Sequence, residues 1–431
     1  MLIKIILSLS FLLITFCQSE IDEKTSKNDS IINSSHLDDL YEEINVSGKT
    51  LGIIYIYSEY PDYKWVGDDD EGIACVDDAA RALIFYLRHY QANNSIECLK
   101  KAEHLIEFLL FMQSENGFFY NFIFDDYSVN KTHMNSVNQP NWWSWRAMWA
   151  LSEGYKIFKD VDMEFAKQIL SGLVNSVKAT KKTLPTERII KKINGFEFPV
   201  WLPSETASDQ ASVLILALLN YSLETKDTSV TYCINNLCDG ILAMQKGDSL
   251  KVPFYAFLSW QNVWHAYGNS QSYALLKASK ILERADLKTA ALNEINFFYD
   301  YLLGKNLLSS FAIEKDDDSF KFSKKNKFSQ IAYNFRPIIF ACLEAFELTR
   351  DSAYVFKSIE FTKWFFGKNV AEKQMYDPSN GRCFDGINSE FDVNLNSGAE
   401  STIEALLTLL AIEQNRISKK AFNKYLVQDT N

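Results

Sequence analysis

Apolar residues recur along this chain with the three- and four-residue spacing of helices. The spacing begins near residue 36 and continues almost to the C-terminus, whereas few segments show the strict alternation of half-buried strands. The pattern also repeats over a longer period of about 55 to 72 residues. Each period contains one helix that is apolar nearly all round, followed by one helix with a polar face. The sequence therefore predicts a mostly helical protein built from helical pairs.

Six such pairs are expected. A helix that is apolar on every side must be buried on every side, and a closed inner ring inside a second, amphipathic ring buries all of them. Segments 96–113, 163–177 and 353–369 have Lys and Glu on one side and fit the outer ring. We therefore expect residues 36–431 to form a single all-α domain, an (α/α)6 toroid. Its inner helices are expected near 76–90, 140–155, 204–221, 259–278, 328–348 and 396–413.

The lengths of the connecting segments indicate where the functional site lies. The segments before the inner helices are long, such as 115–139 and 179–203, whereas those after them are short. A stacked superhelix of helical pairs would show the same alternation of helices without gathering the long loops at one rim. Long loops at one rim form a funnel, and binding residues are often on such loops. The site is therefore expected at the N-terminal ends of the inner helices.

The N-terminal residues 1–19 have the composition of an export signal. One lysine precedes an apolar stretch, Ile5 to Phe16, that is too short to span a membrane. Cys17 resembles the acylated cysteine of bacterial lipoproteins, although Phe16 replaces the small residue that such signals prefer. Residues 20–35 are polar and are interpreted as a linker. We expect an exported protein that is either periplasmic or anchored to the cell envelope through Cys17.

The charge and the cysteines restrict the class of partner. A net charge of −11 opposes general binding of nucleic acid or of anionic membranes, so a neutral carbohydrate fits better and a lipid at Cys17 would be the membrane contact. The other cysteines match no zinc spacing, and neither a metal nor a cofactor is expected. Cys75 and Cys383 would form a disulfide if their loops meet, the alternative being two buried thiols.

Carboxylates at the predicted helix openings are candidate catalytic residues, because one of two close carboxylates often has a raised pKa and acts as a general acid. Each has a structural alternative. An aspartate at a helix start can cap it, Ser204-Glu205 resembles a routine helix start where the dipole favours an acid, and Ser-x-x-Glu is a capping box. The candidates are Asp77 and Asp78, then Glu205 and Asp209 on one expected helix face, and Glu400, which follows Ser397 in a capping-box pattern.

Aromatic rings next to amides and charges suit sugars, whose C–H faces stack on rings while their hydroxyls need hydrogen-bond partners. Trp142, Trp145 and Trp149 follow core spacing, whereas Trp143 and Trp260 are better candidates for stacking. Gln261 and His265 are expected on one helix face. The loop 376–395 contains Asn380-Gly381, which predicts a tight hairpin that brings Asp385 over the funnel. The full set of candidate substrate-binding residues is Arg81, Trp143, Arg146, Trp260, Gln261, His265, Asn334, Arg336 and Asp385.

Two segments resemble a known family. Residues 72–87, GIACVDDAARALIFYL, and residues 364–411 around MYDPSNGRCFDG resemble the six-hairpin glycosidase-like superfamily. The likeness is nearest to the (α/α)6 domain associated with bacterial glycosyltransferases and mannoside-processing gene clusters. The resemblance covers the first and last hairpins, whereas the middle hairpins share only the spacing of the helices. In the wider superfamily, inverting hydrolases and unsaturated-uronide hydrolases place paired carboxylates at the inner-helix openings. The resemblance implies such a role for Asp77, Asp78, Glu205, Asp209 or Glu400.

Three functions fit these features. The leading one is an inverting glycoside hydrolase for a neutral glycan or oligosaccharide, with Asp78 paired with Glu205 or Asp209. The second is a polysaccharide lyase for a uronate-containing glycan, served by His265, Tyr267, Asn334 and Arg336. The third is a glycan-binding protein without catalysis, in which the carboxylates only cap helices.

Overall fold

The computed structural model describes residues 30–193, 195–305, 307–317 and 319–429. The chain separates into two units, Met1–Ile31 and Ile32–Asn431, and all of the described helices and strands belong to the larger unit. The predicted export signal and Cys17 lie outside the described residues. Within the described ranges, none of the helices combines the length and the apolar character needed to cross a membrane.

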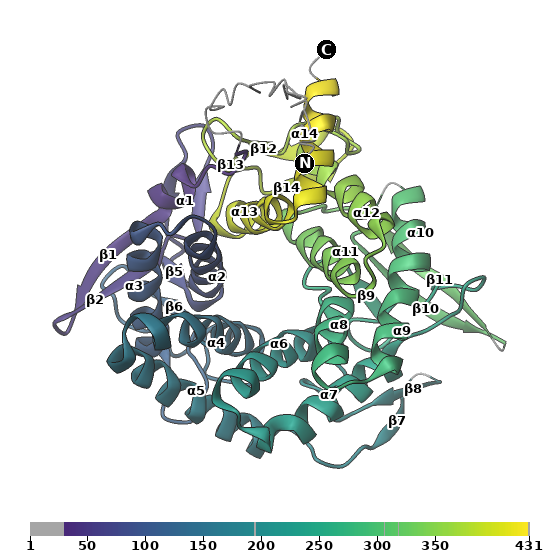
Figure 1. Ribbon diagram of the computed structural model, residues 1–431, viewed down its shortest axis with the longest axis horizontal. Coiled ribbons are helices and arrows are strands. Elements are labelled where there is room, and N and C mark those ends of the chain that lie inside the picture. Colours follow the sequence, from purple (N-terminus) through teal and green to yellow (C-terminus); the bar gives the residue numbers. More distant parts are fainter. Residues whose placement is uncertain (1–29, 194, 306, 318, 430–431) are drawn as a thin grey trace, which may run out of the picture. The chain divides into compact units, whose positions relative to one another are not determined.

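Six helices form the inner ring of the larger unit (Figure 1). Each contacts the next in the chain, and the last contacts the first, so the ring is closed. This closure confirms the predicted (α/α)6 toroid and excludes an open superhelix. The inner helices are α2 (Val76–Asn93), α4 (Trp142–Val161), α6 (Ser208–Thr225), α8 (Gln271–Ile281), α11 (Arg336–Thr349) and α13 (Ala399–Gln414).

Each inner helix packs against the outer helix that follows it. In the outer helix α5, the buried Phe165, Ile169 and Leu173 recur at the spacing of one helical face, whereas its other face is wet. The inner helix α6 is instead buried without a break from Ser208 to Leu219. The outer helices are α3 (Ile96–Met112), α5 (Met163–Thr183), α7 (Thr231–Met244), α9 (Ala285–Asn293), α10 (Tyr299–Gly304), α12 (Ser352–Thr362) and α14 (Arg416–Asp429).

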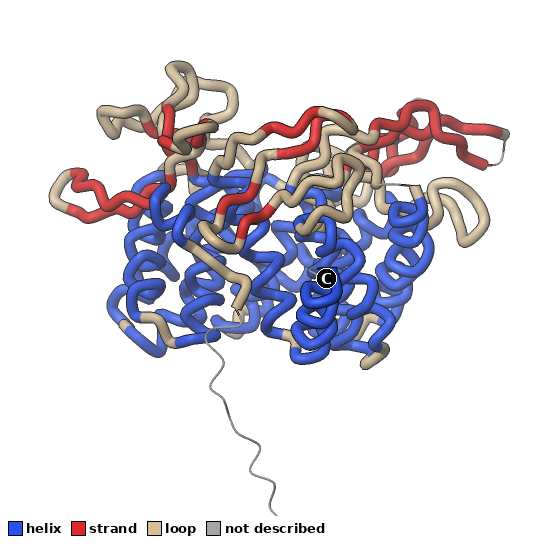
Figure 2. Tube along the Cα trace, turned by 90° about the horizontal axis from the view of Figure 1, so that it is seen from above, coloured by secondary structure: helices blue, strands red, loops and turns tan. Residues whose placement is uncertain are grey.

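Short antiparallel strands gather at one end of the helices, together with the long loops (Figure 2). The sequence pattern missed these strands because most are too short to show alternation. A short helix, α1 (Ser35–Leu40), precedes them. The pairs are β1 (Tyr41–Val46) with β2 (Lys49–Ile54), β3 (Tyr57–Glu59) with β4 (Lys64–Val66), β5 (Ala74–Cys75) with β6 (Phe122–Ile123), β7 (Ile190–Ile193) with β8 (Phe196–Pro199), β12 (Tyr376–Asp377) with β13 (Arg382–Cys383), β14 (Gly386–Ser389) with β15 (Asp392–Asn394), and β10 (Ser310–Asp316) with both β9 (Val263–His265) and β11 (Ser319–Asn326).

Three inner helices begin four or more residues after the predicted start. Helix α6 begins at Ser208 rather than 204, and α11 begins at Arg336 after a 3-10 turn, Ala332–Asn334. The largest error concerns residues 259–270, which form a loop and strand β9 before α8. These segments contain buried apolar residues such as Trp264, so their hydrophobicity extended the helical pattern into the rim.

The hairpin predicted around Asn380-Gly381 is present. Tyr376 pairs with Cys383 and Asp377 with Arg382, and Gly381 adopts a φ of +80°. A Cβ atom at Gly381 would lie 2.2 Å from the carbonyl oxygen of Asn33, so both the turn and the close packing require glycine. The hairpin thereby joins the start of the toroid to its last repeat.

Candidate functional site

A pocket of about 370 Å3 lies at the N-terminal ends of the inner helices. Its volume is within the usual range of small-molecule sites. Aromatic rings and charged groups alternate around it, which suits a ligand with both apolar faces and hydroxyl groups. The lining residues are Asp77, Arg81, Asn121, Phe122, Asn135, Trp142, Trp143, Arg146, Tyr267, Ile331, Tyr333 and Glu400. We call this the mouth pocket.

The start of α2 presents two acidic residues to this region. Cys75 is the N-cap, and its Sγ accepts a hydrogen bond from the backbone N–H of Asp78 at 3.4 Å. The alternative in which Asp77 caps α2 is therefore wrong, and its carboxylate is available for contacts with other residues. Both acids lie in the first turn, where the helix dipole favours negative charge.

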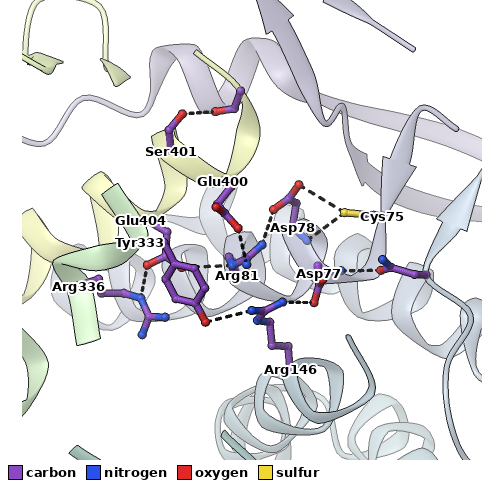
Figure 3. A network of polar contacts seen from close by, with 12 residues as sticks. Cys75, Asp77, Asp78, Arg81, Arg146, Tyr333, Arg336, Glu400, Ser401 and Glu404 are labelled. Atoms are coloured by element: carbon purple, nitrogen blue, oxygen red, sulfur yellow. Dashed lines mark hydrogen bonds and ion pairs between the residues drawn. The ribbon is translucent and has the colours of Figure 1, made fainter. Parts of the chain in front are cut away.

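Arg81 is the centre of the polar network (Figure 3). It is 5% exposed, and its Nη1 donates to Asp78 Oδ1 at 2.7 Å. Its Nη2 donates to Glu400 Oε2 at 2.7 Å, and its Nε lies 3.2 Å from Glu404 Oε1. The first and last inner helices are thus joined by one guanidinium that contacts three carboxylates.

Arg146 on α4 forms a second link. Its Nη1 donates to Asp77 Oδ1 at 2.5 Å, and its Nη2 donates to the hydroxyl oxygen of Tyr333 at 3.0 Å. The guanidinium also lies over the Trp142 ring, 4.9 Å from its centroid. Because the Tyr333 oxygen accepts from Arg146, its own O–H remains able to donate to a ligand. Arg146 therefore orients Asp77 and Tyr333 along one side of the mouth pocket.

Arg336 lies deeper than the other two arginines. It is 3% exposed, its Nε donates to Glu404 Oε2, and Tyr333 lies over it with 5.1 Å between the guanidinium carbon and the ring centroid. It does not line the mouth pocket. Its partner Glu404 is fully buried on α13. Arg336 therefore lies behind Tyr333 and away from the mouth pocket.

The carboxylates differ in exposure and in pKa. Burial raises the pKa of Asp78, with a further contribution from Asp77, while Arg81 acts in the opposite direction. Removal from water also raises the pKa of Glu400, Arg81 lowers it, and Asp78 and Glu404 raise it further. The side chains of Glu400 and Asp77 are 42% and 19% exposed, against 4% for Asp78. Glu400 and Asp77 are thus the carboxylates that a ligand can reach.

Glu400 does not take part in a capping box. The N-cap of α13 is Gly398, and the capping bond comes instead from the predicted loop residue Asp385. Asp385 Oδ1 accepts from the Gly398 N–H at 2.8 Å and from the Ser401 hydroxyl at 2.6 Å. The capping interpretation of Glu400 is therefore wrong, and Asp385 fixes the start of the helix that presents Glu400.

Asp209 and Glu205 do not share a helix face. Glu205 precedes α6 in a left-handed conformation, with a φ of +67°, and its exposed side chain lies 3.9 Å from Lys191 Nζ. Asp209 is buried in the first turn of α6, and its Oδ2 lies 2.9 Å from Nε2 of His265. Glu205 therefore lies outside the mouth pocket, and Asp209 supports a histidine instead.

His265 lies next to the mouth pocket rather than in its lining. Its Nδ1 lies 2.8 Å from the carbonyl oxygen of Tyr267, and its ring stacks on that of Tyr267 with 3.8 Å between centroids. Burial raises the pKa of Tyr267, and Asp209, Tyr333 and Glu400 add to this effect. His265 and Asp209 therefore hold Tyr267 at the pocket wall.

The remaining candidates lie elsewhere. Gln261 and His265 are not on one helix face, because residues 259–270 are not helical, and the Gln261 N–H donates to Thr206 Oγ1 at 3.1 Å. Trp260 is 44% exposed and does not line the mouth pocket. Asn334 is buried, and its side chain donates to the carbonyl oxygen of Ser329 at 3.4 Å. Trp143 does line the pocket, although its Nε1 donates to the carbonyl oxygen of Phe119.

Sequence reasoning missed Tyr333 and assigned Trp142 to the core. Tyr333 lies in a 3-10 turn directly before α11, and Trp142 is the first residue of α4. The available signal was their position at the openings of inner helices, because residues at these openings face the mouth pocket.

The cysteines and possible metal ligands form no further centre in the described chain. Cys75 and Cys383 are both buried and free, so the proposed disulfide is absent. Burial raises the pKa of both thiols, which leaves them protonated and unreactive near neutral pH. Among the described residues, no group of three or more His, Cys, Asp or Glu side chains is placed to hold a metal ion.

Comparisons with known proteins identify the fold. No protein-family model matches the sequence, and no curated protein matches it. The structure is similar to cellobiose 2-epimerase from Bacillus thermoamylovorans B4167, with a TM-score of 0.61, 13% identity and coverage of 88% of this chain and 95% of the other.

Two other similar structures are those of an isomerase and a glycoside hydrolase. D-mannose isomerase gives a TM-score of 0.58, 11% identity and coverage of 89% and 96% of the two chains. A family 76 glycoside hydrolase from a bovine Bacteroides thetaiotaomicron strain gives a TM-score of 0.54, 11% identity and coverage of 90% of this chain and 79% of the other. The chain thus shares the (α/α)6 toroid fold of these structures.

Proposed function

We propose that this protein is a carbohydrate-active enzyme that hydrolyses a glycosidic bond in a neutral sugar bound at the mouth pocket. One observation carries the proposal. Asp77 and Glu400, on the first and last inner helices, both reach this pocket, and each is held by a different arginine. Neither carboxylate caps its helix, so the interpretation as a binding protein with purely structural acids has no support here.

Glu400 is the proposed general acid. Its raised pKa favours the protonated form that donates to a leaving oxygen, and its 42% exposed side chain can reach a substrate. Asp77 is the proposed base that activates water, since its carboxylate lines the mouth pocket and is held in place by Arg146. An inverting mechanism uses such an acid and base on opposite sides of the sugar. This assignment replaces Asp78, Glu205 and Asp209 as the leading candidates.

The charge around the mouth pocket favours a neutral sugar over a uronate. Two arginines and two acids line it, and each arginine is paired with one of the acids. A lyase needs cationic groups that are free to neutralise the substrate carboxylate. Arg146 is paired with Asp77 and Arg336 with Glu404, while His265 is paired with Asp209. None of these side chains is free, so the lyase alternative is disfavoured.

Epimerisation or isomerisation of a reducing sugar is the second candidate, because proteins with those activities share this fold. Such reactions need a base that removes a proton from carbon. His265 stacks on Tyr267 at the pocket wall, but both of its ring nitrogens face protein acceptors, Asp209 and the Tyr267 carbonyl. The contacts therefore favour the hydrolase.

One experiment distinguishes these functions. The full chain would be incubated in D2O with neutral glucans, mannans and xylans of defined length, and the products followed by NMR. Hydrolysis creates new reducing ends whose first-formed anomer is inverted. Epimerisation or isomerisation instead changes the reducing-end sugar and incorporates deuterium at C2. Exchange at C2 without new reducing ends would overturn the hydrolase proposal, as would the absence of any reaction across the panel.

A further inference from the structure

A second cavity opens at the other end of the inner ring. It has a volume of about 630 Å3 and is lined by residues from all six inner helices, most of them in the C-terminal halves. It is larger than the mouth pocket. We call it the distal cavity. The residues that matter most for its chemistry are Arg88, Trp149, Glu153, Tyr273, Lys277 and Glu344.

Ion pairs hold the charged groups of this cavity in place. Arg88 Nη2 lies 3.0 Å from Glu153 Oε1, and Trp149 Nε1 donates to the same oxygen at 3.3 Å. Lys277 Nζ lies 2.8 Å from Glu344 Oε2. The side chains of Arg88, Glu153 and Glu344 are only 19%, 15% and 11% exposed. Fixed donors and acceptors therefore border the cavity, and each of these positive charges has a negative partner beside it.

Aromatic surface lies next to these polar groups. The guanidinium of Arg88 lies 5.8 Å from the centroid of Trp149 and 5.4 Å from that of Phe340, and all three residues line the cavity. Tyr273 contributes a further ring. A cation near a helix C-terminus ordinarily interacts with the negative end of the helix dipole, and Lys280 in the last turn of α8 fits that role. Arg88 and Lys277 are instead paired with acids.

The distal cavity is separated from the mouth pocket. Between them lies a void of about 10 Å3, lined by Arg81, Arg146, Trp149, Tyr333 and Arg336 among others. A void of this size is at the limit for a single water molecule. Trp149 borders both the void and the distal cavity. A sugar cannot pass between the two ends of the ring, so a ligand at one end is distinct from a ligand at the other.

We propose that the distal cavity is a second binding site, for a neutral mono- or disaccharide. The ion pairs Arg88–Glu153 and Lys277–Glu344 offer donors and acceptors to hydroxyl groups, and the rings offer stacking surfaces, a combination that suits a sugar. The proposal does not require catalysis at the mouth pocket.

Two matched variants test the proposal. Ala411→Trp on α13 places a large ring in the distal cavity, and Asn135→Trp does the same in the mouth pocket. The probes are glucose, mannose and cellobiose, titrated by calorimetry. Wild type and Asn135→Trp should retain a site that Ala411→Trp loses, with affinity lowered at least about tenfold. Unchanged binding to Ala411→Trp would refute the site, as would no binding of any probe to wild type.

Amide hydrogen exchange on the wild-type chain locates the site even if Ala411→Trp fails to fold. Saturating sugar should slow exchange in residues 216–223 and 411–415, which line the distal cavity. Protection confined to the mouth, such as residues 72–81, would assign all binding to the mouth pocket and overturn the inference. Loss of catalysis in Asn135→Trp with retained sugar binding would support the distal cavity and the mouth pocket independently.

Discussion

Arg81 Nη2 donates to Glu400 Oε2 at 2.7 Å, across the seam where the first and last inner helices meet. The same guanidinium contacts the buried carboxylates of Asp78 and Glu404. Glu400 is the exposed member of this cluster, with its side chain 42% exposed. One buried arginine therefore orients the carboxylate that faces the mouth pocket, and the electrostatics of the cluster set the chemistry of that carboxylate.

Glu400→Gln should lower kcat by about two to four orders of magnitude while the fold persists, because a general acid contributes on that scale. The raised pKa of Glu400 keeps the acid protonated to a higher pH than usual. In wild type, kcat/KM should therefore fall as the pH rises through the pKa of Glu400, and this alkaline limb should vanish in the variant. The measurement is a pH–rate profile on the glycan that the NMR panel identifies.

A substrate with a leaving group that needs no proton provides the control for Glu400. The variant should recover most of its activity on an activated aryl glycoside, because the acid is then dispensable. The matched variant Glu205→Gln changes an exposed side chain outside the pocket and should leave the rate unchanged. Equal loss on both substrates would contradict the role of Glu400 as an acid.

Asp77→Asn should also lower kcat by about two to four orders of magnitude, since it removes the proposed base. Unlike Glu400→Gln, it should be equally impaired on the activated aryl glycoside, because water attack is still required. Steady-state kinetics on the two substrates separate the two carboxylates. Recovery of Asp77→Asn on the activated substrate would show that the roles are exchanged, and normal turnover on both would exclude Asp77 from the reaction.

The fold was predictable because its signal is local and repeated. Two kinds of helix alternate through the chain: helices that are apolar on every side, such as α6, and helices with one solvent-exposed face, such as α5. The ring closes because the helices that are apolar on every side must be buried on every side. The positions where inner helices begin were less predictable, because the rim also buries rings such as Trp264. A loop residue buried by tertiary packing has the same composition signal as a helical one.

The site was predictable only in part. Asp77 and Glu400 were among the candidates because acids at helix openings are visible in the sequence. Arg146 and Arg81 were candidates too, but their ion pairs with these acids could not be predicted, because the pairs form between different hairpins. Capping was misjudged for a similar reason: the bond that caps α13 comes from Asp385, which is remote in sequence from the helix start. Such pairings depend on side-chain geometry between repeats, which the periodicity does not specify.

Arg81→Met should destabilise the fold by about 3–5 kcal/mol, because it leaves the buried Asp78 and Glu404 without their shared cation. Chemical denaturation measures this change. The control Arg350→Met removes an exposed ion pair with Glu347 and should cost at most about 1 kcal/mol. If Arg81→Met folds, the alkaline limb of its pH–rate profile should move to higher pH, since Arg81 lowers the pKa of Glu400. Equal stability of the two variants would refute the central role of Arg81.

Glu294 provides a test of stability that is independent of catalysis. It is fully buried at the start of the π turn after α9, where its carboxylate accepts from the Phe257 N–H at 2.8 Å and the Ser272 hydroxyl at 2.7 Å. Burial raises its pKa from 4.5 to about 7. Between these values the native state binds the proton more tightly than the unfolded state. The contribution of Glu294 to the free energy of unfolding is therefore complete below pH 4.5 and falls as the pH rises towards 7.

Glu294→Gln should remove this pH dependence, because the amide carries no titrating proton but keeps an oxygen for the Phe257 N–H. The free energy of unfolding, measured by denaturant titration from pH 4 to pH 8, should show wild type losing stability relative to the variant as the pH rises, and then a constant difference above about pH 7. For the exposed control Glu314→Gln, the difference from wild type in the free energy of unfolding should not change in this way between pH 4.5 and pH 7. A constant difference between wild type and Glu294→Gln across the whole range would mean that Glu294 does not titrate there, and the burial of an ionisable group at this position would then need another explanation.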